Sequence, residues 1–167
     1  MKRVQLHTDG SCLFNNTNLE YSPGGWCYIL NYKNYEKIDY GYEDKTTNNR
    51  MEITAVIKGL EALKEKCDVD FYSDSQYVLK ALSEYLENWK AKEFNKKNSK
   101  IKNLDLWKKL DKLIQEKVNI ATYTWIKGHD KQENNSMILE HARKQNNRCD
   151  FFAREKAKEM YKNMTTN

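Results

Sequence analysis

Hydrophobic positions in the first part of the chain alternate with polar ones, which is the spacing of strands. VQLHT (4–8) predicts a first strand that ends at Asp9, and the Asn-, Ser- and Gly-rich segment 11–25 predicts a loop. GWCYILNY (25–32) and YEKIDYGYE (35–43) are rich in aromatic and β-branched residues. These two runs predict an antiparallel pair of strands.

After residue 50 the spacing of apolar residues becomes helical, as Ile53, Val56, Ile57 and Leu60 show. In order, the pattern predicts a helix at 50–66, a strand at 69–74, a helix at 75–87, a helix with its apolar face from Leu104 to Ile114, a strand at 119–128 and a last helix at 150–162. Three consecutive strands favour a meander, and the later strands alternate with helices. We therefore predict an α/β fold in which one domain, 1–167, holds a five-stranded mixed sheet flanked by helices on both faces.

Composition is typical of a globular protein: apolar residues make up 39% of the 167 residues and charged residues 32%. No apolar run approaches the roughly 20 residues that span a membrane, so no membrane partner is expected. The polar N-terminus predicts no export signal, and the four cysteines follow no zinc-binding or paired spacing. We expect reduced thiols and a cytoplasmic protein.

Positive charge is concentrated in one segment. Six lysines and one acid between Lys90 and Lys102 give +5, which equals the net charge of the whole chain. A compositional bias towards lysine would spread the charge evenly, so the local excess indicates a polyanionic partner.

Four acids stand at predicted strand or helix ends: Asp9, Glu52, Asp74 and Asp150. Each alone is explained by turn chemistry, helix capping or the helix dipole. Neighbouring strands would bring them together, however, and two carboxylates about 4 Å apart repel by roughly 4 kcal/mol at an effective dielectric of 20. Oxygen ligands select Mg²⁺ or Mn²⁺, and two such ions are the apparatus for displacement at phosphorus. The acids and the lysines together predict phosphodiester chemistry.

Five ordered motifs resemble those of type 1 ribonuclease H: TDGSC (8–12), TTNNRMEITAVIKGLEAL (46–63), YSDSQYV (72–78), WIKGH (125–129) and NNRCDFFAREKA (146–157). NWK (88–90) and NLDLWKKL (103–110) resemble the edges of that family's basic protrusion, which we expect at about 89–103. The match spans nearly the whole chain and includes all four acids.

The resemblance implies an endoribonuclease that hydrolyses the RNA strand of RNA–DNA hybrids and leaves 5′-phosphate and 3′-hydroxyl ends. Asp9, Glu52, Asp74 and Asp150 match the tetrad that binds two Mg²⁺ ions, one activating water and the other stabilising the leaving oxygen. His129 matches a histidine of the catalytic loop. The family is usually monomeric, and Met1 just before the first strand favours a free-standing protein over a tethered reverse-transcriptase domain.

The resemblance also implies a set of hybrid contacts. Asn15, Asn48 and Gln76 match residues that read the minor groove, where 2′-hydroxyls distinguish RNA from DNA. Cys12 and Asn49 match neighbouring contacts, and Thr47 matches a residue of the DNA-phosphate pocket. The protrusion is expected to contribute Tyr85, Trp89, Phe94, Lys90, Lys92, Lys96, Lys97, Lys100 and Lys102. Trp107 falls in the same region, but we interpret it as packing between helices.

Two features depart from the family pattern. The first loop is longer, with Phe14 and the extra stretch 17–21, and 20 residues separate His129 from Asp150. The predicted extended loop, about 130–146, includes SMILEHARK (136–144), which is typical of a short helix capped by Ser136. His141 is therefore an alternative to His129. A hybrid-binding or double-stranded-RNA-binding module without catalysis is the alternative function, and loss of an acid would favour it.

Overall fold

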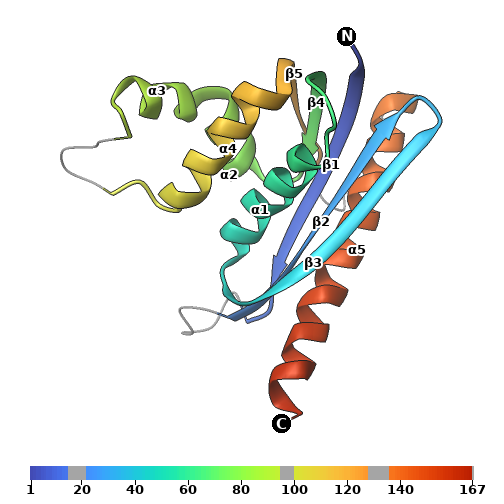
Figure 1. The fold of residues 1–167 in the computed structure, drawn as a ribbon. Coiled ribbons are helices and arrows are strands. Elements are labelled where there is room, and N and C mark those ends of the chain that lie inside the picture. Colours follow the sequence, from blue (N-terminus) through green and yellow to red (C-terminus); the bar gives the residue numbers. More distant parts are fainter. Residues whose placement is uncertain (15–21, 95–99, 128–135, 167) are drawn as a thin grey trace.

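The chain forms a sheet of five strands with helices on both faces in a computed structural model, which describes residues 1–14, 22–94, 100–127 and 136–166 (Figure 1). The elements are β1 (Arg3–Cys12), β2 (Ser22–Tyr32), β3 (Tyr35–Thr46), α1 (Asn48–Glu61), β4 (Cys67–Ser73), α2 (Gln76–Lys80), a π-helical turn (Ala81–Tyr85), α3 (Leu86–Ala91), α4 (Leu104–Lys117), β5 (Val118–Trp125) and α5 (Met137–Thr165).

The strand order is β3-β2-β1-β4-β5. The first three strands pair antiparallel, while β4 pairs parallel with both β1 and β5. Figure 1 shows α1 to α4 on one face of this sheet and α5 on the other. The predicted fold class is confirmed.

The main core lies between the sheet and α1 to α4. Leu6, Val56, Leu60 and Leu110 are fully or almost fully buried in it. Trp107 is also completely buried, which confirms that it packs between helices. A smaller core under α5 is made of Cys27, Ile29, Cys149 and Ala153.

Close approach of α5 depends on Gly25 in β2. A Cβ there would lie 2.1 Å from the Ala153 carbonyl oxygen, far inside van der Waals contact. Any larger residue at this position would push the helix away from the strand.

The last helix was predicted wrongly. It begins at Met137, not at residue 150, so Asp150 lies within the helix and does not start it. Ser136 caps the helix as predicted, with its side chain accepting the Leu139 N–H, but the helix continues without a break through residue 150. The described part of the predicted loop 130–146 is therefore helical from Met137 onwards.

Smaller corrections concern the first two strands. Asp9 does not end β1, which continues to Cys12, and Asp9 pairs with Cys27 of β2. The predicted loop 11–25 is strand at both described ends, because β2 already begins at Ser22. The two strands extend beyond their hydrophobic runs because the backbone of residues 9–12 in β1 pairs with that of residues 24–27 in β2.

The chain from residue 76 to residue 91 is helical throughout, with the π-helical turn joining α2 to α3, and it extends past the predicted end at 87. Glu93 and Phe94 then take left-handed backbone conformations, with φ of 52° and 58°, which turn the chain away from α3. The four cysteines are free thiols. Among the described residues, no helix is both long and apolar enough to cross a bilayer.

Candidate active site and nucleic-acid interface

Three acids from three separate elements meet at one end of the sheet. Asp9 comes from β1, Glu52 from α1 and Asp74 from the residue after β4. One carboxylate oxygen of each lies within 4.8 Å of those of the other two. This is the only group of three or more potential metal ligands within the described part of the chain.

Two local features bring these acids together. Because β1 and β4 are parallel neighbours with His7 opposite Tyr72, residues two positions further along both strands lie level. The second feature is Gly10, which lets α1 lie directly against β1. A Cβ at this position would stand 2.3 Å from the Glu52 backbone nitrogen, so only glycine fits there. Glu52 is thereby brought beside Asp9.

The carboxylates of Asp9 and Glu52 are buried, and each has an oxygen without a hydrogen-bond partner among the described residues. Asp9 Oδ1 accepts the Gly10 N–H at 2.9 Å, but Asp9 Oδ2 and Glu52 Oε2 have no hydrogen-bond partner among the described residues. Burial, followed by the charge of Asp74, raises the pKa of Asp9 well above its ordinary value. Burial and the charge of Asp9 do the same to the pKa of Glu52.

Asp150, on α5, is not one of the three acids whose oxygens lie within 4.8 Å of one another, but it lies near enough for its charge to act on them. Its Oδ1 accepts a hydrogen bond from Arg154 Nε at 3.1 Å, one helical turn later. Its negative charge contributes to the raised pKa of both Asp9 and Asp74. Burial raises the pKa of Asp74 most, and a hydrogen bond from Asn146 opposes that rise.

Cys149 is fully buried beneath Asp150 and packs beside Cys27. Burial raises the pKa of its thiol well above the ordinary value, so the thiolate is scarce. A thiol in this state is a packing group and not a nucleophile.

The two histidines considered for catalysis differ in position. His129 lies outside the described residues. His141 is on α5, nine residues and about 13 Å along the helix axis from Asp150. Its Nε2 lies 3.4 Å from Asn31 Oδ1, and its ring meets the buried His7 edge-on at 5.7 Å. His141 therefore does not reach the acid cluster.

Several residues expected to contact the hybrid lie at helix starts near the acids. Thr47 is the N-cap of α1, its hydroxyl accepting the Arg50 N–H, and Asn48 and Asn49 begin the helix. This helix end presents unpaired backbone N–H groups, which suit a phosphate. Gln76 begins α2 beside Asp74 and is exposed.

Cys12, by contrast, is turned towards neighbouring backbone. Its Sγ lies 2.8 Å from Ser22 Oγ and 3.6 Å from the Thr46 carbonyl oxygen, at the start of β2 and the end of β3. Asn15, Lys96 and Lys97 lie outside the described residues.

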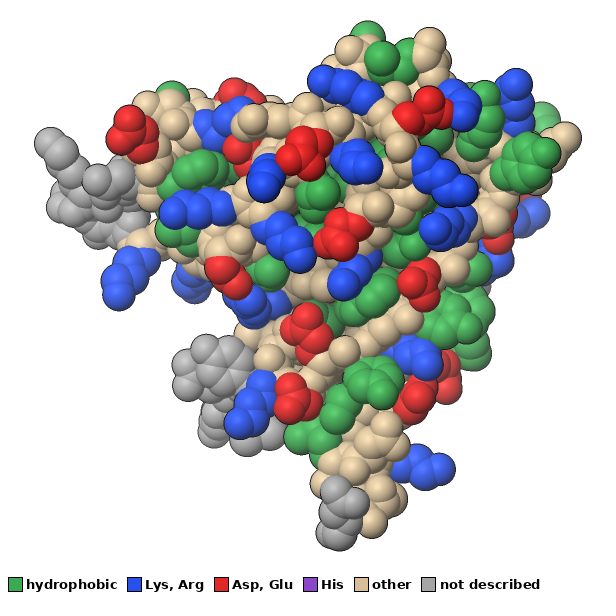
Figure 2. All heavy atoms as spheres, in the orientation of Figure 1, with side chains coloured by type: hydrophobic (Ala, Val, Ile, Leu, Met, Phe, Trp, Pro, Cys, Tyr) green, Lys and Arg blue, Asp and Glu red, His purple; other side chains and the backbone are tan. Residues whose placement is uncertain are grey.

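The described part of the protrusion holds a cleft of about 270 Å³ between α2, α3 and the segment before α4. Its lining combines three aromatic side chains, two lysines and one aliphatic side chain: Tyr77, Tyr85, Trp89, Lys100, Lys102 and Ile101. Trp89 packs between Tyr85 and Trp107, with ring centroids 6.1 and 5.7 Å away. Figure 2, in the orientation of Figure 1, shows lysine and arginine side chains interspersed with acids over the face of the molecule that carries α3 and α4.

The lysines of the strip are not equivalent. Lys90 Nζ lies 3.2 Å from Asp111 and 3.4 Å from Glu87, so it is held in ion pairs against α4. Lys92, Lys100 and Lys102 are exposed. Phe94 is half-buried, with Lys108 Nζ 5.8 Å from its ring centroid.

Three residues around the acids were missed by sequence reasoning. Asn146 lies near enough to Asp74 to lower the pKa of its carboxyl, Trp125 donates its Nε1–H to the Asp74 carbonyl oxygen at 3.1 Å, and Arg154 pairs with Asp150. Asn146 and Arg154 stand four residues on either side of Asp150. Had the last helix been recognised at its full length, this spacing would have identified both.

The donor set fits a hard divalent cation. It consists of carboxylate oxygens only, two of which are buried without a partner among the described residues. A cation between them would offset both their desolvation and their mutual repulsion.

Comparisons with known proteins agree with this geometry. The RNase H family model matches residues 1–158. A ribonuclease H of Solibacter usitatus is 45% identical over 163 residues, covering 97% of this chain and 99% of the relative. Among solved structures, LC9-RNase H1, described as a type 1 RNase H with the type 2 active-site motif, matches with a TM-score of 0.77. That match is 22% identical and covers 96% of this chain and 74% of the other.

A second structure, LC11-RNase H1 in complex with an RNA/DNA hybrid, matches with a TM-score of 0.62 at 16% identity, over 93% of this chain and 97% of that one. At such identities the two structures establish the fold. The family match and the curated relative establish more, because they span nearly the whole chain: it belongs to the ribonuclease H family, a class of enzymes.

Proposed function

We propose that the protein is an endonuclease that hydrolyses the RNA strand of RNA–DNA hybrids and leaves 5′-phosphate and 3′-hydroxyl ends. The observation that carries the proposal is the meeting of Asp9, Glu52 and Asp74 within 4.8 Å, in a chain of the ribonuclease H family. A binding module without catalysis would have no need to bury acids that repel one another.

Divalent cations, Mg²⁺ or alternatively Mn²⁺, would be held by Asp9, Glu52, Asp74 and Asp150. When bound, two such ions supply an activated water and stabilise negative charge on the leaving oxygen. The unpartnered oxygens of Asp9 and Glu52 support this assignment.

The surrounding residues would fix the acids in place. Arg154 holds the Asp150 carboxylate, and Trp125 holds the backbone of Asp74 through its carbonyl oxygen. Because Arg154 and Trp125 already restrict the two acids, less conformational entropy would be lost when the carboxylates bind a cation.

Hybrid binding would use two surfaces beside the acids. The N-terminus of α1, with Thr47, Asn48 and Asn49, suits a phosphate of the DNA strand. The exposed Lys92, Lys100 and Lys102 would contact phosphates without reading sequence, and Trp89 and Tyr85 would supply aromatic surface beside them. His129 is assigned the movement of a proton or the release of product.

A monomer in the cytoplasm is the proposed working form. The four free thiols support a reducing compartment.

The test is cleavage of an end-labelled RNA–DNA hybrid with Mg²⁺, in which the parent, Asp9→Asn and Asp39→Asn are compared. Asp39 is an exposed acid on β3 and serves as the matched control. We expect the parent and Asp39→Asn to cut only the RNA strand, and Asp9→Asn to bind the hybrid without cutting it. Binding by the parent without metal-dependent cleavage would overturn the proposal.

A further inference from the structure

A second hollow lies on the α5 side of the sheet, at the opposite end of β1 from the acids. It measures about 420 Å³ and is lined by Arg3, Gln5, Asn31, Lys33, Met137, Ile138 and His141. This volume falls within the roughly 300–1,000 Å³ typical of small-molecule sites. Gln5 stands four residues before Asp9 on the strand, about 13 Å away along it.

The polar lining of the hollow is rich in hydrogen-bond donors, and its positive charge comes mainly from Lys33 because Arg3 is paired with Asp70. Two of its residues, Arg3 and Lys33, carry positive charge; none of the seven is acidic, but Arg3 is paired with Asp70 and Asn31 donates to Glu36 at 3.1 Å. Arg3 uses Nε and Nη2 to bind Asp70, at 2.9 and 2.6 Å, which fixes its guanidinium and leaves three of its five N–H donors. Lys33 contacts only the Tyr32 ring within the described chain, with its Nζ 5.3 Å from the centroid.

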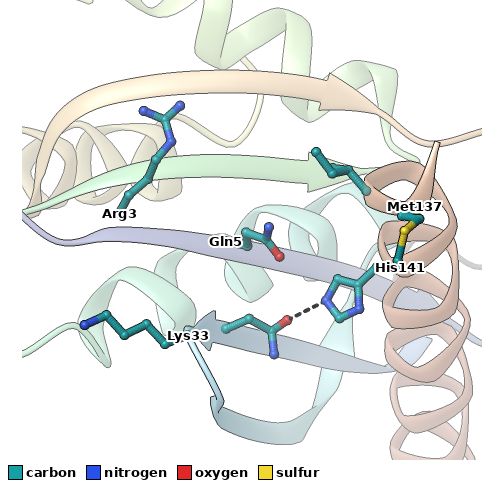
Figure 3. Close-up of a pocket in the computed structure, with 7 residues that line it drawn as sticks. Arg3, Gln5, Lys33, Met137 and His141 are labelled. Carbon is teal, nitrogen blue, oxygen red and sulfur yellow. Dashed lines mark hydrogen bonds between the residues drawn. The ribbon is translucent and has the colours of Figure 1, made fainter.

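The middle of the hollow is lined by neutral polar groups. The Gln5 side chain has no hydrogen-bond partner among the described residues, although it is partly buried. Asn31 Oδ1 accepts from Gln145 at 2.7 Å and lies beside His141, so this wall is held in place by a network. Figure 3 shows Gln5 from β1 and His141 from α5 extending into the same space, with the Asn31–His141 contact dashed.

The wall on the α5 side is apolar. Met137 and Ile138, in the first turn of the helix, are 85% and 60% exposed. In Figure 3 Met137 lies at the α5 end of the hollow, whereas Arg3 and Lys33 lie towards its other end. Cationic and apolar groups are therefore separated, with amide and imidazole groups between them.

This arrangement matches a ligand with an anionic group at one end and a flat apolar body at the other. We propose that the hollow is a binding site for a nucleoside monophosphate, separate from the acid cluster. The phosphate would bind Arg3 and Lys33, the sugar hydroxyls would bond with Gln5 and Asn31, and the base would pack on Met137 and Ile138. A thioether next to a branched aliphatic side chain offers a polarizable surface for a base.

Isothermal titration calorimetry tests the site by measuring the binding of adenosine 5′-monophosphate to the metal-free parent. Parallel titrations use adenosine and inorganic phosphate, which carry the two halves of the ligand separately. We expect saturable binding of one monophosphate per chain, at least tenfold tighter than binding of either half. Because neither metal nor hybrid is present, the result does not depend on the proposed nuclease activity.

Two variants locate the binding. Lys33→Gln should weaken monophosphate binding at least fivefold, whereas Lys37→Gln, on the same β2–β3 hairpin but outside the hollow, should leave it unchanged. Met137→Ser should weaken the monophosphate and leave inorganic phosphate unaffected. Absence of saturable binding, equal effects of the two lysine variants, or equal affinity for monophosphate and inorganic phosphate would each overturn the proposal.

Discussion

Gly10 lies directly beneath the backbone of Glu52, so close that a Cβ at Gly10 would stand 2.3 Å from the Glu52 nitrogen and 2.4 Å from the Met51 carbonyl carbon. The obstacle is helix backbone, which cannot rotate away as a side chain can. The contact fixes the height of α1 above β1, and with it the separation of the Asp9 and Glu52 carboxylates.

Replacing Gly10 with alanine should therefore affect both stability and the site. We expect Gly10→Ala to lower the free energy of unfolding by about 1–3 kcal/mol, as overpacking does. It should also weaken Mg²⁺ binding about tenfold or more, because α1 must move away from β1. Urea unfolding and a Mg²⁺ titration measure the two effects.

Gly59→Ala is the control for this prediction. Its Cβ would meet the end of the Leu6 side chain, at 2.5 Å, in the same helix–strand interface. That variant should change stability without changing Mg²⁺ affinity. Equal losses of Mg²⁺ affinity in the two variants would show that the Gly10 contact has no special part in the site.

The contribution of Asp9 and Glu52 to the stability of the metal-free protein should fall as pH rises. Burial raises the pKa of both carboxyls, and the charge of Asp74 adds to the rise at Asp9 as the charge of Asp9 does at Glu52. A carboxyl whose folded pKa is raised stabilises the fold fully below its ordinary pKa, here 3.8 or 4.5, and loses that contribution as pH rises through the folded value. Asp9→Asn removes one charge from the cluster. It should be more stable than the parent by at least about 1 kcal/mol near pH 8 without metal.

The measurement is the difference in unfolding free energy between Asp9→Asn and the parent, from about pH 5 to about pH 8. Taking the difference cancels His7, whose pKa is lowered to about 3 by burial and which therefore adds stability as pH rises towards 6.5. Glu36, with its pKa lowered to about 2 by Arg148, has completed its contribution above 4.5. A difference that stays constant with pH, or that survives saturating Mg²⁺, would contradict the prediction.

Salt dependence should distinguish the lysines of the strip. Lys100 and Lys102 are exposed beside the aromatic cleft, whereas Lys90 is paired with Asp111 and Glu87. The double variant Lys100→Gln/Lys102→Gln should raise KM for the hybrid and reduce the slope of log KM against log salt by about one to two. Steady-state cleavage at several salt concentrations measures both.

Lys90→Gln should behave differently, because it loses ion pairs within the protein. We expect lower stability and an almost unchanged salt slope. If Lys90→Gln flattens the slope as much as the double variant does, Lys90 contacts phosphate in the complex despite its pairing in the free protein.

The histidines give a further pair of variants. His129→Ala should lower kcat and leave Mg²⁺ binding intact, as expected for a group that moves a proton or assists release. His141→Ala should leave kcat unchanged, because His141 lies about 13 Å along α5 from Asp150. Single-turnover and steady-state cleavage by both variants would check this, and a lower kcat in His141→Ala alone would mean that the roles are reversed.

The sequence by itself determined which segments form strands, the order of the elements along the chain and which acids belong to the site; it did not determine the exact ends of the strands. The aromatic and β-branched run in β2 and the helical spacing of apolar residues in α1 are local signals, because each lies within the residues of one element. The motif around Asp74 was likewise sufficient to place that acid after a strand, and β4 does end at Ser73. The acids could be expected to meet because parallel strands end at the same edge of a sheet.

Only the tertiary structure decided where the last helix begins and what surrounds the acids. In the segment of α5 before Asp150 the buried residues are Ala142, Gln145, Asn146 and Cys149, so two of the four are polar. Ala142 and Leu139 pack in a small apolar cluster with Tyr72 and Ile126, and Gln145 bonds to Asn31 and Glu36, so polar contacts with distant residues add to a small hydrophobic face in this part of α5. Such contacts leave no periodic pattern in the sequence, because each depends on a partner more than 100 positions away.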